Sequence, residues 1–218
     1  MPFYTAILTF LIMLATSSAA VATEVGITED MDSLDVDHLG QKVTIQRIQD
    51  TNNQLTGGFT KTSRPCPPFC IGPMYIAEGV ITVGELEVLD FLANDVNNGT
   101  GVLVDARMPD WYKRGAIPGA INIPFVVFDS GNPYAEQLLL TLGGRQQEGG
   151  NWNFQDALKL LMYCNGPWCD QSRRAIDHLL LVGYPAEKIL YYRGGMHLWQ
   201  ALGLTTVIGE IDELDSTQ

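Results

Sequence analysis

The fold is decided by residues 158–182, which read LKLLMYCNGPWCDQSRRAIDHLLLV. The run from Leu158 to Tyr163 is apolar apart from Lys159 and predicts a buried strand that ends at Cys164. A loop with turn-forming residues follows, and the apolar residues between Ser172 and Val182 recur at helical spacing. This segment is therefore a strand, a loop and a helix, the unit that builds parallel α/β sheets.

Further strands and helices are expected on both sides of this segment. Short apolar runs predict strands at 101–105, 120–123 and 189–192, and helical spacing predicts helices that begin at Thr82, at Ala135 and at His197. In the first helix Thr82 is the expected N-cap, with Glu85 as its capping-box partner. Residues 143–153 are polar and rich in glycine, which indicates a surface loop. Strands that alternate with helices predict an α/β fold with a parallel sheet covered by helices on both faces.

The chain has 218 residues, enough for one domain with terminal extensions. We expect a leader at 1–22, an irregular N-terminal arm at 23–77, the α/β domain at 78–208 and an acidic tail at 209–218.

The leader has the pattern of a secretory signal peptide. No charged side chain precedes Glu24, and an apolar stretch ends in small residues, with cleavage favoured after Ala22. The alternative is an uncleaved membrane anchor, and both place the domain outside the cytoplasm, in a periplasm or an equivalent exported location. An oxidising compartment permits disulfides, and the four cysteines allow three pairings that the sequence does not distinguish.

The formal net charge of -12 excludes one class of partner, because it repels phosphate backbones and the basic residues form no stripe to overcome that repulsion. Nucleic acid is therefore not an expected partner. The cysteine spacings fit common zinc sites poorly, and no glycine-rich phosphate loop is present. We expect neither a metal nor a cofactor.

Cys164 is the candidate nucleophile. Reactive groups in open α/β sheets gather at the carboxyl ends of strands, and a helix that begins just beyond the loop contributes partial positive charge there. That environment lowers the pKa of a thiol, and the thiolate is the reactive form. Arg173 and Arg174, near the start of the helix, are candidates to bind an anionic donor, with a solvated helix surface as the alternative.

Four motifs together resemble one known family, the rhodanese-like sulfurtransferases, over roughly residues 81–207. They are VLVDAR at 102–107, IPGAINIP at 117–124, Tyr163-Cys164 at the start of the loop, and RGGM at 193–196 followed by Trp199. The resemblance implies a parallel sheet between helices and chemistry without a cofactor. A small sulfur donor such as thiosulfate would pass its sulfane sulfur to Cys164 as a persulfide, and a thiol or cyanide would accept it.

The resemblance also implies roles for further residues. Asp105 and Arg107 match positions that brace the loops as a buried carboxylate and guanidinium, and Trp199 is expected in the core. The backbone amides of the loop would cradle the persulfide. That loop comprises Asn165, Gly166, Pro167, Trp168, Asp170, Gln171 and Ser172.

The remaining cysteines leave alternatives open. Cys169 lies five residues after Cys164 and is either a resolving thiol, which attacks a persulfide or sulfenic acid on Cys164, or an inert packed residue. Cys66 and Cys70 form a local structural disulfide in the first interpretation, a redox or sulfur-relay pair docked near Cys164 in the second, and a metal site in the third.

Two other functions compete with sulfur transfer. One is a thiol redox or persulfide-relay protein that cycles Cys164 and Cys169 and works with another exported protein. The other is a non-catalytic interaction module. A related phosphatase is disfavoured, because Asp170 stands where that chemistry needs an arginine and would repel a phosphate.

Overall fold

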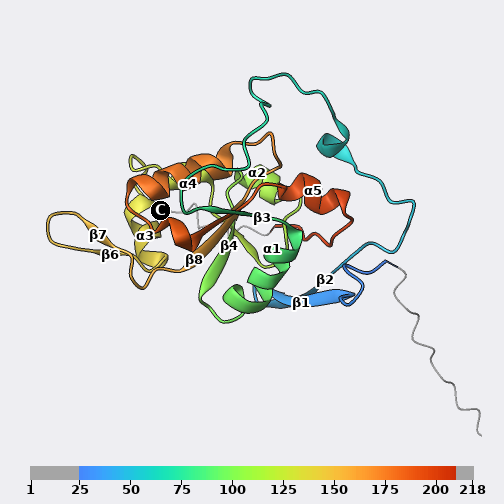
Figure 1. Cartoon of the computed structure of the whole chain (residues 1–218), viewed down its shortest axis with the longest axis horizontal. Helices are drawn as coiled ribbons and strands as arrows, with labels where there is room; N and C mark the ends of the chain where they lie inside the picture. The colour runs from blue at the N-terminus through green and yellow to red at the C-terminus, as the bar shows by residue number, and fades with distance from the viewer. Residues whose placement is uncertain (1–24, 210–218) are drawn as a thin grey trace, which may run out of the picture.

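The computed structural model describes residues 25–209, and the predicted leader and nearly all of the predicted acidic tail lie outside that range. Its centre is a parallel sheet of five strands in the order β3-β9-β8-β4-β5 (Figure 1). These strands are β3 (Ile81–Val83), β9 (Ile189–Tyr192), β8 (Lys159–Tyr163), β4 (Gly101–Asp105) and β5 (Ala120–Asn122). The helices are α1 (Glu85–Phe91), α2 (Pro109–Tyr112), α3 (Ala135–Thr141), α4 (Gln171–Leu181) and α5 (Gly195–Ala201), with a π-helical turn, η2 (Leu92–Val96), directly after α1. The predicted fold class is confirmed.

Each face of the sheet has its own core, because successive side chains of a strand point to opposite faces. Along β8, Leu160 and Met162 pack with residues of α3 and α4, whereas Leu161 and Tyr163 pack with residues of α1 and α5. Trp199 of α5 is fully buried in the second core. The central strands are thus covered on both sides, as their almost continuous apolar sequence predicts.

The first half of the arm differs from the expectation of irregular structure. Strands β1 (Ser33–His38) and β2 (Gln41–Gln46) form an antiparallel hairpin, and its buried residues Val36 and Ile45 join the core beside α1. The turn residues Leu39 and Gly40 both have positive φ, which matches the right-handed twist of a two-residue hairpin. The packed unit therefore reaches further toward the N-terminus than the predicted domain start at residue 78. After an isolated β-bridge between Arg47 and Leu204, the chain from 48 to 80 is irregular apart from one 3-10 turn, η1 (Gly57–Thr60).

The predicted start of the first helix is wrong. Thr82 lies in β3, opposite Tyr191 of β9, and its hydroxyl donates to the carbonyl of Met74, so Gly84 rather than Thr82 is the N-cap. The helix begins at Glu85, and Glu87 rather than Glu85 accepts a hydrogen bond from the backbone N–H of Gly84 at 2.9 Å.

The predicted surface loop at 143–153 contains a two-stranded hairpin, β6 (Arg145–Gln146) and β7 (Trp152–Asn153), which projects from the body of the domain (Figure 1). Across the described range 25–209, no helix has the length and apolar character needed to cross a membrane.

Candidate active site

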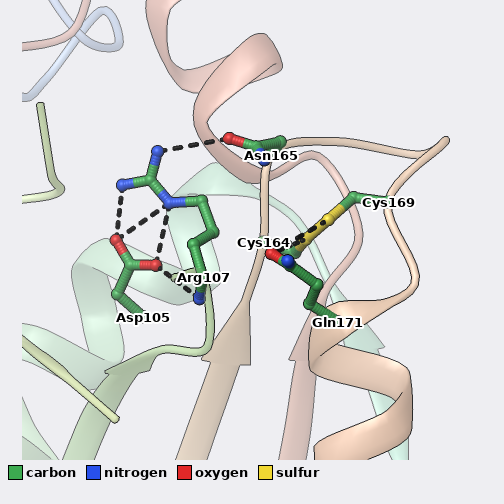
Figure 2. The surroundings of a disulfide bond; sticks show 6 residues. All are labelled: Asp105, Arg107, Cys164, Asn165, Cys169 and Gln171. Atoms are coloured by element: carbon green, nitrogen blue, oxygen red, sulfur yellow. Dashed lines mark hydrogen bonds and ion pairs between the residues drawn. A yellow bond between two sulfur atoms is a disulfide. The ribbon is translucent and has the colours of Figure 1, made fainter. Parts of the chain in front are cut away.

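The site forms at the carboxyl end of β8, where the chain leaves the sheet as a loop and enters α4. Cys164 follows the last residue of β8 and is only 2% exposed, and Cys169 near the end of the loop is 7% exposed. The two residues are joined by a disulfide across the loop (Figure 2). The second disulfide links Cys66 and Cys70 in the arm. Of the three pairings that the sequence permits, the structure therefore contains the one that keeps both bridges local.

The start of α5 is joined to the loop by two backbone hydrogen bonds. Met196 donates its backbone N–H to the carbonyl of Cys164 at 3.1 Å, and His197 donates to the carbonyl of Asn165 at 2.9 Å. Gly195 has a φ of +54°, and a Cβ at this position would come within 2.3 Å of the Cys164 carbonyl oxygen. Gly195 is thus needed so that the backbones of α5 and the loop can approach each other.

A buried ion pair braces the same part of the loop. Arg107 donates from Nη2 to Oδ2 of Asp105 at 2.5 Å, and both side chains are almost fully buried. Arg107 Nη1 also donates to Oδ1 of Asn165 at 3.3 Å, so the guanidinium links the end of β4 to the residue after Cys164 (Figure 2). The Tyr163 hydroxyl donates to Asp105 Oδ2 at 2.8 Å and accepts the backbone N–H of Ile117 at 3.2 Å.

The protonation states of this network follow from its burial. Burial would lower the pKa of Arg107, but the hydrogen bond and the charge of Asp105 outweigh it, and the pKa is raised. Burial, followed by the charge of Asp105, holds the pKa of Tyr163 well above its ordinary value. The guanidinium therefore stays charged and the phenol stays neutral, which lets Tyr163 act as a hydrogen-bond donor.

Gln171, the first residue of α4, faces the Cys164–Cys169 disulfide. The side-chain oxygen of Gln171 lies 3.8 Å from the sulfur of Cys164 and 3.8 Å from the sulfur of Cys169, and the side chain folds back toward the bridge (Figure 2). The backbone N–H of Cys169 donates to the carbonyl of Gly166 at 2.9 Å. Reduction of the bridge would release the Cys164 thiol next to the N-terminus of an 11-residue helix, where an anion is favoured.

The two arginines of α4 point in different directions. Arg174 is exposed, and its guanidinium carbon lies 4.3 Å from the ring centre of Phe125. Arg173 packs against Gly72 of the arm, and its buried Nε has no hydrogen-bond partner among the described residues. Anion binding by this pair stays a prediction.

Residues 56–72 of the arm, which we call the strap, cover the tip of the loop. The rings of Phe69 and Trp168 meet edge to face with their centres 5.4 Å apart, and Gly72 donates its backbone N–H to the carbonyl of Pro167 at 2.7 Å. The guanidinium carbon of Arg64 lies 4.8 Å from the ring centre of Phe69 and 4.4 Å from that of Trp168. Trp168 therefore packs against the strap, which arches over this end of the molecule (Figure 1).

The sequence interpretation missed several residues of the site. Phe59 of the strap stacks on His197, and burial followed by the charge of Arg64 lowers the pKa of His197. A cavity of about 270 Å³ lies between the strap and the domain. It is lined by Thr56, Gly57, Gly58, Phe59, Arg107, Trp111, Arg114, Gly115 and Gln200. Tyr163 was named in a family motif because it directly precedes Cys164, but its place in the buried network with Asp105 was not predicted.

Among residues 25–209, no cluster of histidine, cysteine and acidic side chains has the composition to hold a metal ion.

Strand, disulfide loop and helix together define an α/β domain that carries a cysteine at the carboxyl end of a central parallel strand. The family model of the rhodanese-like domain matches residues 88–202, and the chain belongs to that family. A search of the curated proteins finds no match.

Several solved structures show partial likeness. A human single-domain sulfurtransferase is 24% identical, with 55% of this chain and 95% of that chain covered and a TM-score of 0.38. A thiosulfate sulfurtransferase from Pseudomonas aeruginosa is 21% identical, with 60% of this chain but only 21% of that chain covered and a TM-score of 0.40. A Rhodopseudomonas palustris protein described as a possible tyrosine phosphatase is 21% identical, with 59% and 85% covered and a TM-score of 0.40.

Proposed function

We propose that the protein is a sulfurtransferase that moves sulfane sulfur from a donor such as thiosulfate to a thiol or cyanide through a persulfide on Cys164. Membership of the rhodanese-like family supports a sulfurtransferase role. The observation that carries the proposal is the position of the Cys164 sulfur, at the carboxyl end of β8 and beside the first residue of α4.

The bridge to Cys169 must open before transfer, because a sulfur held in a disulfide is not a nucleophile. An external thiol or dithiol reduces the bridge and leaves Cys164 as the thiolate. That thiolate attacks the outer sulfur of thiosulfate, a new sulfur–sulfur bond forms, and sulfite leaves with the electron pair of the broken bond. An acceptor thiolate or cyanide then attacks the outer sulfur of the persulfide and restores the Cys164 thiolate. The two half-reactions predict ping-pong kinetics.

A second function is favoured by the Cys164–Cys169 bridge itself. The Cys169 thiolate can attack the inner sulfur of a Cys164 persulfide, which expels hydrosulfide and closes the disulfide. A protein that worked mainly in this way would be a thiol redox or persulfide-relay protein with an exported redox partner. In the sulfurtransferase, the same step protects Cys164 when no acceptor is present.

We propose an exported location for either function. The two disulfides support it, because such bridges persist in oxidising compartments and are rare where glutathione keeps thiols reduced. The cavity beside Arg107 supports a small donor or acceptor as the substrate, since it lies between the strap and the side chain that holds Asn165.

The test uses the full chain after reduction and removal of the reductant, in the wild type, in Cys164→Ser and in Cys169→Ser. Thiosulfate is added, mass spectrometry measures the gain of one sulfur on the peptide with Cys164, and cyanide or a thiol serves as acceptor. We expect Cys169→Ser to accumulate the persulfide and to transfer it, and Cys164→Ser to do neither.

Other outcomes separate the alternatives. Full activity in both single variants would show that the site is wrong. Rapid closure of the wild-type bridge with release of hydrosulfide, and without transfer to an acceptor, would favour the redox function. If thiosulfate and other sulfane donors leave every form unmodified, the domain is a non-catalytic interaction module.

A further inference from the structure

The two disulfides of the protein differ in exposure. Cys66 and Cys70 are exposed on the strap, whereas Cys164 and Cys169 are 2% and 7% exposed. Thiol–disulfide exchange needs access of the attacking thiolate to a sulfur atom. An external protein dithiol can therefore reach the Cys66–Cys70 bridge directly, but the folded loop and the strap shield the Cys164–Cys169 bridge.

The strap brings the exposed bridge alongside the buried one. Phe69, the residue before Cys70, contacts Trp168, the residue before Cys169, with ring centres 5.4 Å apart. Two residues beyond Cys70, the N–H of Gly72 bonds to the carbonyl of Pro167 at 2.7 Å, two residues before Cys169. The segment that carries Cys70 thus runs beside the segment that carries Cys169, and two separate contacts hold it there. Arg193 strengthens the second contact by donating from Nη2 to the carbonyl of Gly72 at 2.8 Å.

The charges around this contact favour the thiolates that the exchange needs on both sides. The guanidinium of Arg64 lies over the rings of Phe69 and Trp168, the residues that directly precede Cys70 and Cys169. A positive charge there stabilises a thiolate on the strap. On the other side, Cys164 would leave as a thiolate beside the N-terminus of α4, and a leaving thiol of lower pKa departs faster.

We propose that Cys66 and Cys70 form a thiol relay that admits electrons to the active-site disulfide. An external dithiol, either a small molecule or a dithiol protein, first reduces the Cys66–Cys70 bridge and is itself oxidised. The Cys70 thiolate then attacks the Cys169 sulfur, which forms a Cys70–Cys169 bond and expels the Cys164 thiolate. The Cys66 thiolate attacks Cys70, restores the Cys66–Cys70 bridge and releases the Cys169 thiolate. Two electrons pass from the dithiol to the active site, and every sulfur is accounted for.

This inference rests on the proposed function, since it explains how a sulfurtransferase with a bridged nucleophile becomes active. It also assigns a partner chemistry to the strap. The partner is a dithiol that recognises an exposed disulfide, and it need not enter the active site.

The first test follows reduction of the oxidised full chain by a dithiol, with differential alkylation and mass spectrometry of each cysteine. We expect the strap pair to be reduced first and the active-site pair to follow. In a Cys66→Ser, Cys70→Ser double variant, reduction of Cys164–Cys169 should slow about tenfold, because a tethered thiol acts at an effective concentration on the order of millimolar and the dithiol is supplied at about a tenth of that. A purely structural strap predicts the opposite sign, since loss of its bridge loosens the cover and speeds reduction. Equal or faster reduction in the double variant overturns the relay.

The second test uses two matched single variants. Cys66→Ser leaves Cys70 as a lone thiol, and Cys70→Ser leaves Cys66. The exchange first proceeds without an alkylating reagent, which would cap the exposed lone thiol. The reagent is then added to cap the released Cys164 and to stop further exchange. We expect a Cys70–Cys169 linked peptide in Cys66→Ser and no link to Cys169 in Cys70→Ser. Absence of the linked peptide from Cys66→Ser, or equal linkage in both variants, rejects the relay.

A third measurement separates failure of the relay from failure of the proposed function. A phosphine reduces disulfides without a thiol, so phosphine treatment activates the wild type and the double variant alike, and the phosphine is removed before assay. Sulfur transfer by both forms, together with equal rates of reduction by the dithiol, would reject the relay and retain the sulfurtransferase. Relay-dependent reduction without transfer by either form would reject the sulfurtransferase and retain the redox role.

Discussion

The base and the tip of the active-site loop are held by different kinds of contact. At the base, Asn165 accepts from Arg107 within a buried network that includes Asp105. At the tip, Trp168 meets Phe69 of the strap, most of which lies at the surface. Loss of one partner leaves a buried charge uncompensated at the base, whereas at the tip it only admits water. The comparison indicates that the segment around Cys164 is held rigidly, whereas the strap can separate from the tip of the loop at a small cost in free energy.

The largest effect is expected at the base. Arg107→Met leaves the Asp105 carboxylate buried without its ion-pair partner and should lower the free energy of unfolding by about 3 to 5 kcal/mol. Denaturant unfolding measures it. The matched control is Arg145→Met, which breaks the exposed pair with Asp156 and should cost less than about 1 kcal/mol. Similar losses in both variants would contradict the distinction between buried and exposed contacts.

A smaller loss is expected when only a hydrogen bond of the base is removed. Tyr163→Phe deletes the hydroxyl between Asp105 and the N–H of Ile117 and should cost about 1 to 3 kcal/mol, because both buried groups lose a partner. Tyr134→Phe is the control, since Tyr134 is 65% exposed, and its effect should stay within about 0.5 kcal/mol. If the two variants are equally stable, the network does not depend on this hydroxyl.

At the tip, Phe69→Ala should open the cover with little loss of global stability. The aromatic contact with Trp168 contributes about 0.5 to 1.5 kcal/mol beyond its buried area, so the open population should rise by roughly 2- to 12-fold. Reduction of Cys164–Cys169 by a small phosphine should accelerate by that factor. Reduction by a dithiol through the strap should slow, because the strap cysteines are no longer docked. An unchanged phosphine rate would mean that the strap is not a cover.

The smallest effect concerns pH. Burial and Arg64 lower the pKa of His197, so folding disfavours its protonated form. Above the ordinary pKa of 6.5 the group is neutral in both states, and below it the unfolded chain takes up the proton first. Stability should therefore fall as the pH drops below that value, until the pKa of the folded state is reached. Denaturant midpoints on both sides of the ordinary pKa should differ less in His197→Gln than in the wild type, and equal differences would exclude His197 as the cause.

Much of the fold was predictable because it depends on local patterns. The strands at 101–105 and 189–192 have the bounds expected from their apolar runs, α3 begins at the predicted residue, and α4 matches its predicted helix within one residue at each end. The hairpin β1–β2 also had a signal, the alternation of Leu34, Val36, Val43 and Ile45 around Leu39-Gly40, although its polar surroundings favoured an irregular segment. The N-cap at Thr82 was mistaken because pairing with β9 at the sheet edge overrode a local capping pattern.

The sequence by itself determined the α/β class, the family motifs and the place of Cys164 at the end of a central strand, because strand and helix periodicity and the turn chemistry act over a few residues. Only the tertiary structure decided which cysteines are bridged, that Arg107 joins β4 to Asn165, and that the strap lies on Trp168. Those contacts join residues that are distant in the chain, and their geometry depends on how the packed elements meet. No local pattern encodes that arrangement.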